Sequence, residues 1–111
     1  MQIFSVAKKV TASAGDENYE TIYTVAAARK LTVKKIVFHF PSGTDLYLGV
    51  AVTVGAKQIC PDEGLIYGND CVITLSDDTE VPSGSEIKLY YKNEDTSNPH
   101  SVVVVVEGEI E

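Results

Sequence analysis

Five consecutive valines near the C-terminus restrict the fold more than any other feature of this sequence. A segment with high β propensity, no charge and no proline promotes aggregation when it lies exposed on the edge of a sheet. We therefore expect both faces of this strand to be covered, either as a central strand of the chain's own core or, on one face, by another subunit. Three glutamates follow the run as charged gatekeepers. The run comprises Val102, Val103, Val104, Val105 and Val106.

The rest of the chain repeats with a period of two residues, as β-strands do. The alternation is cleanest over residues 46–54, where the second face is small and weakly polar, so we expect both faces of that strand to be partly covered. Over residues 31–40 the apolar parity changes at Lys34-Lys35, which predicts a β-bulge there. Strands are accordingly expected at residues 3–10, 22–25, 31–40, 46–54 and 87–92, in addition to the valine run.

Turn signals separate these segments at intervals of about ten residues, the spacing of a sandwich or small barrel. Residues 25–33 and 81–89 each consist of a strand end, a corner of small residues and an alternating strand, so we expect the same sheet-to-sheet corner to occur twice. The sequence predicts one all-β domain over residues 1–111, a single antiparallel β-sandwich that is jelly-roll-like and has about eight strands. The turn signals lie at residues 15–18, 41–45, 55–56, 76–78 and 93–99.

Composition and charge exclude several classes of partner. With 44% apolar and 23% charged residues, the 111-residue chain is a normal globular domain and too apolar to be disordered. Its net charge of −7 opposes binding to nucleic acids and to anionic membranes, because both are negatively charged. The N-terminus lacks the uninterrupted apolar segment of a signal peptide, and no stretch is long and apolar enough for a membrane-spanning helix. We expect neither direct nucleic-acid binding nor membrane insertion.

No arrangement of residues in the sequence is typical of an active site. The two histidines, His39 and His100, lack the further ligands that a metal site needs, so we expect both to be structural or surface residues. The common catalytic and phosphate-binding motifs do not occur. Carboxylates gather in the expected loops, either as solvated charges or, if two loops meet, as ligands of a structural cation. We predict no catalytic residue, no dedicated metal site and no cofactor.

The chain's two cysteines, Cys60 and Cys71, bracket a turn-rich acidic segment. Two cysteines alone leave a zinc ion under-ligated, and the neighbouring carboxylates of Asp62, Glu63 and Asp70 oppose the formation of a reactive thiolate. Two interpretations remain. The pair consists of free, mostly buried thiols, or it forms a disulfide that would stabilise the fold by roughly 3 kcal/mol through chain entropy.

Tyrosines and one apolar loop are the candidate contact residues. Tyr47 and Tyr90 are expected on the strand faces opposite the aliphatic residues, where a tyrosine ring can stack on a sugar, contact a protein partner or simply pack. Leu65, Ile66 and Tyr67 lie between glycines inside the cysteine segment and form a candidate contact tip.

The corner-and-strand units around residues 26–40 and 82–93, together with the apolar final strand, resemble those of small β-sandwich or jelly-roll proteins that decorate virus and phage particles. The resemblance implies a non-enzymatic structural protein, assembled in the host cytoplasm and located in the virion. It also implies self-association as a homotrimer or another symmetric array, or docking on a capsid-like assembly. The alternative is a module that binds carbohydrate or another small ligand through surface tyrosines. A cupin-like metal enzyme is disfavoured by the presence of only two histidines.

Overall fold

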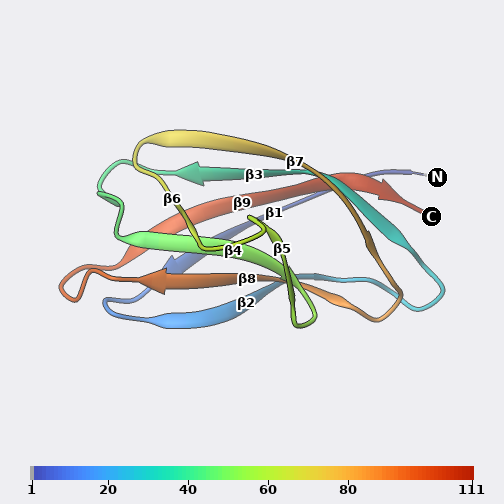
Figure 1. Cartoon of the computed structure of the whole chain (residues 1–111), viewed down its shortest axis with the longest axis horizontal. Coiled ribbons are helices and arrows are strands. Elements are labelled where there is room, and N and C mark those ends of the chain that lie inside the picture. Colours follow the sequence, from blue (N-terminus) through green and yellow to red (C-terminus); the bar gives the residue numbers. More distant parts are fainter. Residues whose placement is uncertain (1) are drawn as a thin grey trace.

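The computed structural model describes residues 2–111, which form two packed antiparallel β-sheets and contain no helix (Figure 1). The four-stranded sheet has the order β1-β9-β3-β7, and the five-stranded sheet has the order β2-β8-β4-β5 with the short β6 paired to β4. The predicted all-β sandwich is confirmed, with nine strands in place of about eight. The strands are β1 (Gln2–Ala12), β2 (Glu17–Thr24), β3 (Leu31–Phe40), β4 (Leu48–Val54), β5 (Lys57–Cys60), β6 (Ile66–Tyr67), β7 (Cys71–Val81), β8 (Glu86–Asn93) and β9 (His100–Ile110).

The strands pair from the two ends of the chain inwards. β1 pairs with β9, β2 with β8, β3 with β7 and β4 with β5, and successive pairs lie in alternate sheets. The chain is therefore one long hairpin of four strand pairs rolled into a sandwich, which is the jelly-roll arrangement. Among residues 2–111, no helix of a length and hydropathy that could cross a membrane is found.

The two ends of the sandwich differ in what they carry (Figure 1). One end, which we call the loop end, holds four connections: β1–β2, β3–β4, β6–β7 and β8–β9. Backbone hydrogen bonds join these loops, since Gly15 N donates to Asp95 O and Glu94 N donates to Tyr47 O, both at 2.9 Å. The start of β1 and the end of β9 lie at the opposite, terminal end, together with the β2–β3 and β7–β8 corners.

The two similar corners expected from the sequence lie side by side at the terminal end. Val25 N donates to Ser85 O at 3.0 Å, and Gly84 N donates to Val25 O at 2.8 Å. Each corner takes the chain from one sheet to the other, from β2 to β3 and from β7 to β8. The predicted repetition of the sheet-to-sheet corner is thus confirmed.

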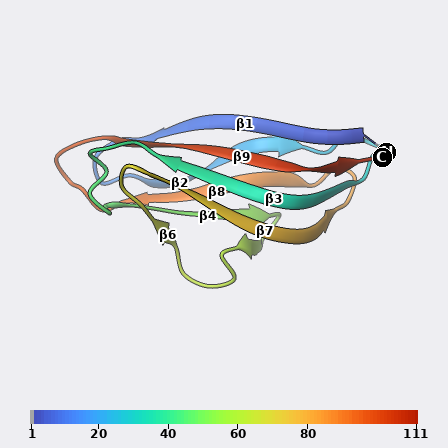
Figure 2. The ribbon, with the colours of Figure 1, turned by 90° about the horizontal axis from the view of Figure 1, so that it is seen from above.

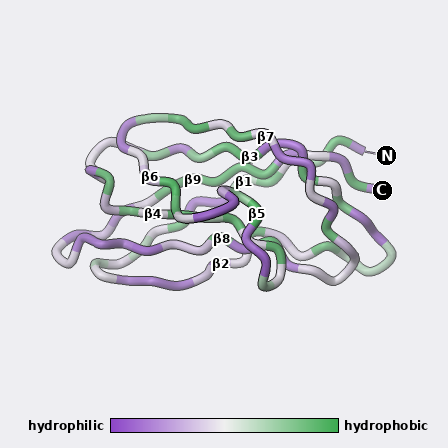
Figure 3. The backbone as a smooth tube through the Cα atoms, viewed as in Figure 1, coloured by the Kyte–Doolittle hydropathy of each residue, from purple (hydrophilic) through white to green (hydrophobic). Residues whose placement is uncertain are grey.

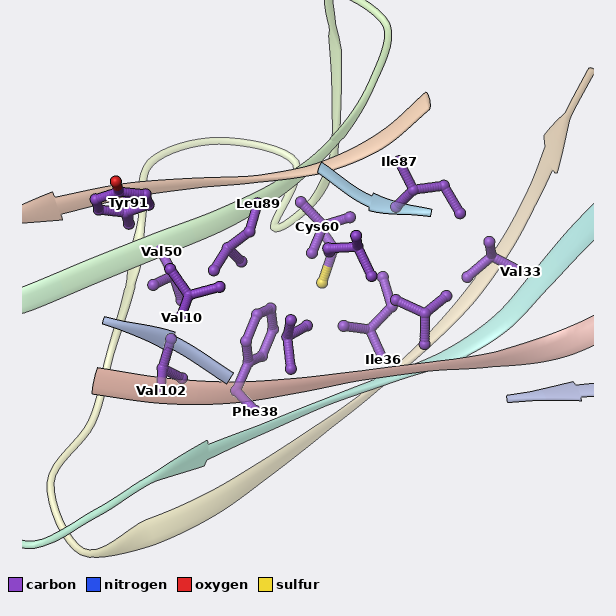
Figure 4. Close-up of a cluster of buried hydrophobic side chains, with 14 of the residues drawn as sticks. Val10, Val33, Ile36, Phe38, Val50, Cys60, Ile87, Leu89, Tyr91 and Val102 are labelled. Carbon is purple, nitrogen blue, oxygen red and sulfur yellow. The ribbon is translucent and has the colours of Figure 1, made fainter. Parts of the chain in front are cut away.

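The core lies between the inner faces of the two sheets, where Phe38 and Val102 from one sheet point toward Leu89 and Val50 from the other (Figure 4). It obeys the period of two read from the sequence, because inward side chains alternate with outward ones along each strand. The fully buried side chains include Leu31, Val33, Ile36, Phe38, Leu48, Val50, Val52, Val81, Ile87, Leu89, Val102, Val104 and Val106.

The valine run lies in a central strand, which was one of the two arrangements expected from the sequence. β9 lies between β1 and β3, and Val102, Val104 and Val106 are fully buried on its inner face. Val103 and Val105 point to the outside of the four-stranded sheet and are only partly buried. The chain's own core therefore covers one face of the run, and its neighbours in the sheet leave the other face open to solvent.

The bulge predicted at Lys34-Lys35 is confirmed. Val33 pairs with Gly108 and Lys35 pairs with Glu107, so Lys34 is an extra residue on β3. The extra residue restores the inward direction of the apolar side chains on both sides of it. Gly108 is required at this point, because a Cβ atom there would lie 2.0 Å from the backbone oxygen of Thr32.

Three expected boundaries are wrong. The strand predicted over residues 46–54 begins at Leu48, because Asp45 and Leu46 have the left-handed φ values of 49° and 65° and form a turn. The predicted turns at residues 15–18 and 76–78 lie partly or wholly in β2 and β7. Partial cover of both faces of β4 was predicted, and its first six residues, Leu48 to Thr53, are all buried.

Candidate functional site

The outer face of the four-stranded sheet carries an apolar stripe at its centre, which we call the valine face and which no loop within residues 2–111 covers. Figure 2 looks onto this side, where β1, β9, β3 and β7 lie next to one another. The register places the outward side chains in rows across the four strands. Val72 is 56% exposed at the edge of the stripe. The valine face consists of Ala7, Val37, Val72, Val103 and Val105.

Charged residues border the valine face on both sides. Toward the terminal end, Lys35 Nζ lies 3.3 Å from Glu107 Oε2, across the pairing of β3 with β9. Toward the loop end, Lys9 and His39 flank Val103 in one row. A groove of about 430 Å³ opens beside that row, between the loop-end parts of β3, β7 and β9. The stripe is therefore bounded by polar groups, as the apolar centre of a protein interface is.

The outer face of the five-stranded sheet is polar and aromatic, and we call Tyr19, Tyr67 and Tyr90 its tyrosine face. The ring centroids of Tyr19 and Tyr90 lie 5.1 Å apart, on the paired strands β2 and β8. In Figure 3 the tube has long hydrophilic stretches along β2 and β8, whereas β9 is largely hydrophobic. Tyr19 is 55% exposed and was missed by sequence reasoning, because residues 15–18 were interpreted as a turn before a shorter strand.

The hydroxyl groups of the tyrosine face already have partners. The Tyr90 hydroxyl donates to the Glu17 carboxylate, and this hydrogen bond, with burial second, raises the pKa of Tyr90 to about 12. The Tyr67 hydroxyl donates to Glu94 Oε2 at 2.8 Å, which likewise raises the pKa of Tyr67. Both hydrogen bonds exist only while the phenol is protonated, so each is lost on ionisation.

Leu65, Ile66 and Tyr67 do not project from the molecule as a tip. All three are partly buried, and Ile66 and Tyr67 form β6, which pairs with Val50 and Gly49 of β4. The side chains of Leu65 and Tyr67 cover the outer surface of Gly49, where an added Cβ would lie within 2.8 Å of both. The segment therefore covers β4 on its outer face, and a partner contact through it stays a prediction.

Tyr47 belongs to the loop end and not to the tyrosine face. Its ring stacks on the ring of His100, with centroids 6.2 Å apart and planes inclined by 16°. His100 Nε2 lies 2.8 Å from Asp95 Oδ2, in a pair that is largely buried. Hydrogen bonds, from the Ser97 backbone first and from His100 next, lower the pKa of Asp95 to about 2. His100 is structural here, and sequence reasoning missed its aspartate partner although the two residues are only five positions apart.

Cys60 and Cys71 are free thiols in the structure. Cys60 is buried in the core from β5, and burial is the main reason why its pKa rises to about 11. Cys71 is partly buried at the start of β7, at the groove beside the valine face. Within residues 2–111 no group of three or more metal-ligating side chains converges.

Comparisons with known proteins place the fold among solved structures. No family model matches the chain, and no curated protein matches its sequence. The capsid structure of Helicobacter pylori bacteriophage KHP30 contains a similar chain at 13% identity and TM-score 0.56, over 99% of this chain and 97% of that one. The structure of FLHE matches at 11% identity and TM-score 0.57, over 97% and 96%.

A chain in the structure of Sulfolobus turreted icosahedral virus matches at 12% identity and TM-score 0.64. The match covers 98% of this chain but only 29% of the viral one, so this chain corresponds to less than a third of that protein's length. The resemblance to virion jelly-roll proteins that the sequence indicated is thus found among the solved structures. At these identities it shows the shared fold.

Proposed function

We propose that this protein is a non-enzymatic structural subunit of a virus or phage particle, which self-associates or docks on a larger capsid-like assembly. The similar folds in two viral structures support the setting, and one of them matches over nearly the full length of both chains. A location in the virion and assembly in the host cytoplasm belong to the same proposal, as does a homo-oligomer such as a trimer.

The valine face is the observation that carries this proposal. Val37, Val103 and Val105 lie near the middle of a sheet surface and have no cover from the chain's own loops. These three valines are partly buried and Val72 is 56% exposed, and an apolar stripe that reaches solvent inside a polar border is typical of interaction sites. A net charge of −7 keeps such a chain from associating indiscriminately through its other surfaces.

Two experiments test the proposal. Light scattering of the purified chain at micromolar concentration should show a defined oligomer, and a strict monomer would count against self-association. The genes next to the coding sequence should encode capsid or tail proteins, and a neighbourhood of metabolic genes would contradict the virion setting.

A second candidate function is favoured by the tyrosine face. The exposed ring of Tyr19 beside Tyr90 gives a stacking surface of the kind that binds sugar rings. Affinity electrophoresis in gels containing polysaccharides tests this function. Tyr19→Ala and Tyr90→Ala should each abolish a shift in mobility, whereas Tyr47→Ala, which alters the loop end, should leave it unchanged. Absence of any shift with the unaltered chain rejects this candidate for the polysaccharides used.

A further inference from the structure

We propose that two copies of this chain pack face to face through the valine face, about a two-fold axis that runs parallel to the strands between β9 and β3. The proposal rests on the self-association included in the proposed function, and it adds the surface and the symmetry. A two-fold interface uses the same surface on both copies, so that surface must complement itself.

The register of β9 and β3 supplies this complementarity. Val105 lies opposite Val37 and Glu107 lies opposite Lys35 within one copy. The two-fold axis places β9 of one copy over β3 of the other. Each outward residue of β9 therefore faces, on the second copy, the same β3 residue with which it is paired in its own chain. Val105 then lies over Val37 of the second copy, and Glu107 lies over Lys35 of the second copy.

The charges at the terminal-end border favour the same arrangement. Lys35 and Glu107 are partly exposed and 3.3 Å apart, so each copy presents one positive and one negative group side by side. Rotation about the axis places each group over its opposite and turns two separate ion pairs into a square of four alternating charges. Such complementarity fixes the relative position of two surfaces more than it adds to affinity.

The row of Val103, toward the loop end, is compatible with this axis. The register places Val103 over His39 of the second copy, and Lys9 over Val72. No two like charges meet in this row. A two-fold axis perpendicular to the strands and through the Val105 row would instead place Glu107 over Val103 and Lys35 over His39, so the opposite charges of the two copies would not meet.

The size of the outer surface of the four-stranded sheet, the valine face together with its charged borders, matches what a specific dimer needs. Four strands at about 4.8 Å spacing and nine residues at about 3.3 Å each give a surface of roughly 20 by 30 Å. Two such surfaces bury roughly 1,200 Å² in total, which lies at the lower end of specific protein interfaces. Two sheets packed in this way meet through their side chains as the sheets of a sandwich do.

Charge-swap variants test the proposal by sedimentation velocity across micromolar concentrations, with circular dichroism to verify the fold. The unaltered chain should form a dimer. Val105→Lys and Lys35→Glu should each weaken that dimer, by about 100-fold and about 10-fold, because every substitution occurs twice in a two-fold interface. The double variant Lys35→Glu/Glu107→Lys should restore the dimer, since opposite charges again face each other. Lys88→Glu makes the same charge change on the outer face of the other sheet and should have no effect.

The outcomes separate this inference from the proposed function. If the chain associates and Val105→Lys and Lys35→Glu leave the association unchanged, another surface makes the contact; this inference then fails and the structural role stands. If the double variant fails to recover although it is folded, the strand-parallel axis is wrong. A strict monomer overturns the inference together with self-association, and leaves only docking on a different partner, which the gene neighbourhood tests separately.

Discussion

The two outer faces of the sandwich differ in whether the chain covers them. On the five-stranded sheet, the segment of Leu65 and Tyr67 lies over Gly49 of β4, and the tyrosine hydroxyls of β6 and β8 bind glutamates of the same chain. On the four-stranded sheet, no loop crosses the outer surface of β9 and β3, and Val103 and Val105 face outward. The chain covers the first face in part, although Tyr19 stays 55% exposed there, and we propose that a second molecule covers the other.

The difference follows from the lengths of the connections. The β5–β7 connection includes β6, which pairs beside β4 and places the Leu65 and Tyr67 side chains over Gly49, whereas the β2–β3 and β7–β8 corners are short and lie at the terminal end (Figure 1).

Gly108→Ala should produce the largest effect, because it disrupts the sheet that carries the valine face. Its Cβ would meet the backbone of Thr32 at 2.0 Å, and backbone atoms at the bulge cannot move aside as a side chain can. We expect a loss of about 3 kcal/mol or more in the free energy of unfolding, measured in urea. Gly55→Asn is the control, since a Cβ at Gly55 meets nothing within 4 Å and asparagine tolerates its φ of 57°. A Gly108→Ala variant within 1 kcal/mol of the unaltered chain would show that the bulge does not bring β3 so close to β9.

Gly49→Ala tests the covered face in the same way and should cost less. The added Cβ meets only the ends of the Tyr67 and Leu65 side chains, at 2.6 and 2.8 Å, and these can shift. We expect a loss of about 1–2 kcal/mol and displacement of Tyr67 from Glu94. Because the hydrogen bond to Glu94 raises the pKa of Tyr67, that pKa should fall in the variant, as an absorbance titration of the tyrosines can show. An unchanged Tyr67 titration would mean that Gly49 does not position the covering segment.

Much of the fold could be predicted from the sequence because the direction of a side chain on a strand is a local property. The parity change at Lys34-Lys35 located the bulge, and a central strand was one of the two covers expected for the valine run. The start of β4 was missed because distant residues fix the preceding turn. Asn69 Oδ1 accepts from Asp45 N at 3.2 Å, and the buried Thr44 hydroxyl donates to Gly68 O at 2.5 Å.

The candidate site was harder to predict because it depends on which strands are neighbours. Tyr19 and Tyr90 are 71 positions apart and meet only because β2 pairs with β8. Tyr47 was expected on a strand face and lies instead on His100 at the loop end. The valine face was predicted only in part. The sequence indicated that both faces of the valine run need cover, but it did not show which face the chain's own core would leave open.

The two cysteines offer a smaller test, because one belongs to each sheet. Cys60 in β5 is 3% exposed, and its pKa rises from an ordinary value of 9.0 to about 11, mainly through burial, so at neutral pH its thiolate is about 100-fold rarer than that of an ordinary thiol. Cys71 in β7 lines the groove beside the valine face. Labelling of the native protein with a thiol reagent should therefore modify Cys71 well before Cys60, with Cys71→Ser removing the fast phase. Under denaturing conditions both thiols should react, and a missing thiol would indicate a disulfide.

Tyrosine ionisation on the covered face is the smallest effect that we expect. The neutral Tyr90 phenol donates to Glu17, and ionisation would place two negative charges in contact, so the pKa rises from 10.0 to about 12. A folded-state pKa above the unfolded one means that the stabilisation is complete below pH 10 and is lost as the pH rises from about 10 to about 12.

Glu17→Gln removes the negative charge beside Tyr90 and leaves the valine face unaltered. In an absorbance titration, the last tyrosine of the unaltered chain to ionise should be Tyr90. In the Glu17→Gln variant this last transition should move down toward pH 10, and in Tyr90→Phe it should be absent. Glu94→Gln provides the matched control, since it lowers the pKa of Tyr67 alone. A last transition that is identical in Glu17→Gln and the unaltered chain would mean that the Tyr90 hydroxyl is free. It would then be available to a ligand, and the tyrosine face would be as open to partners as the valine face.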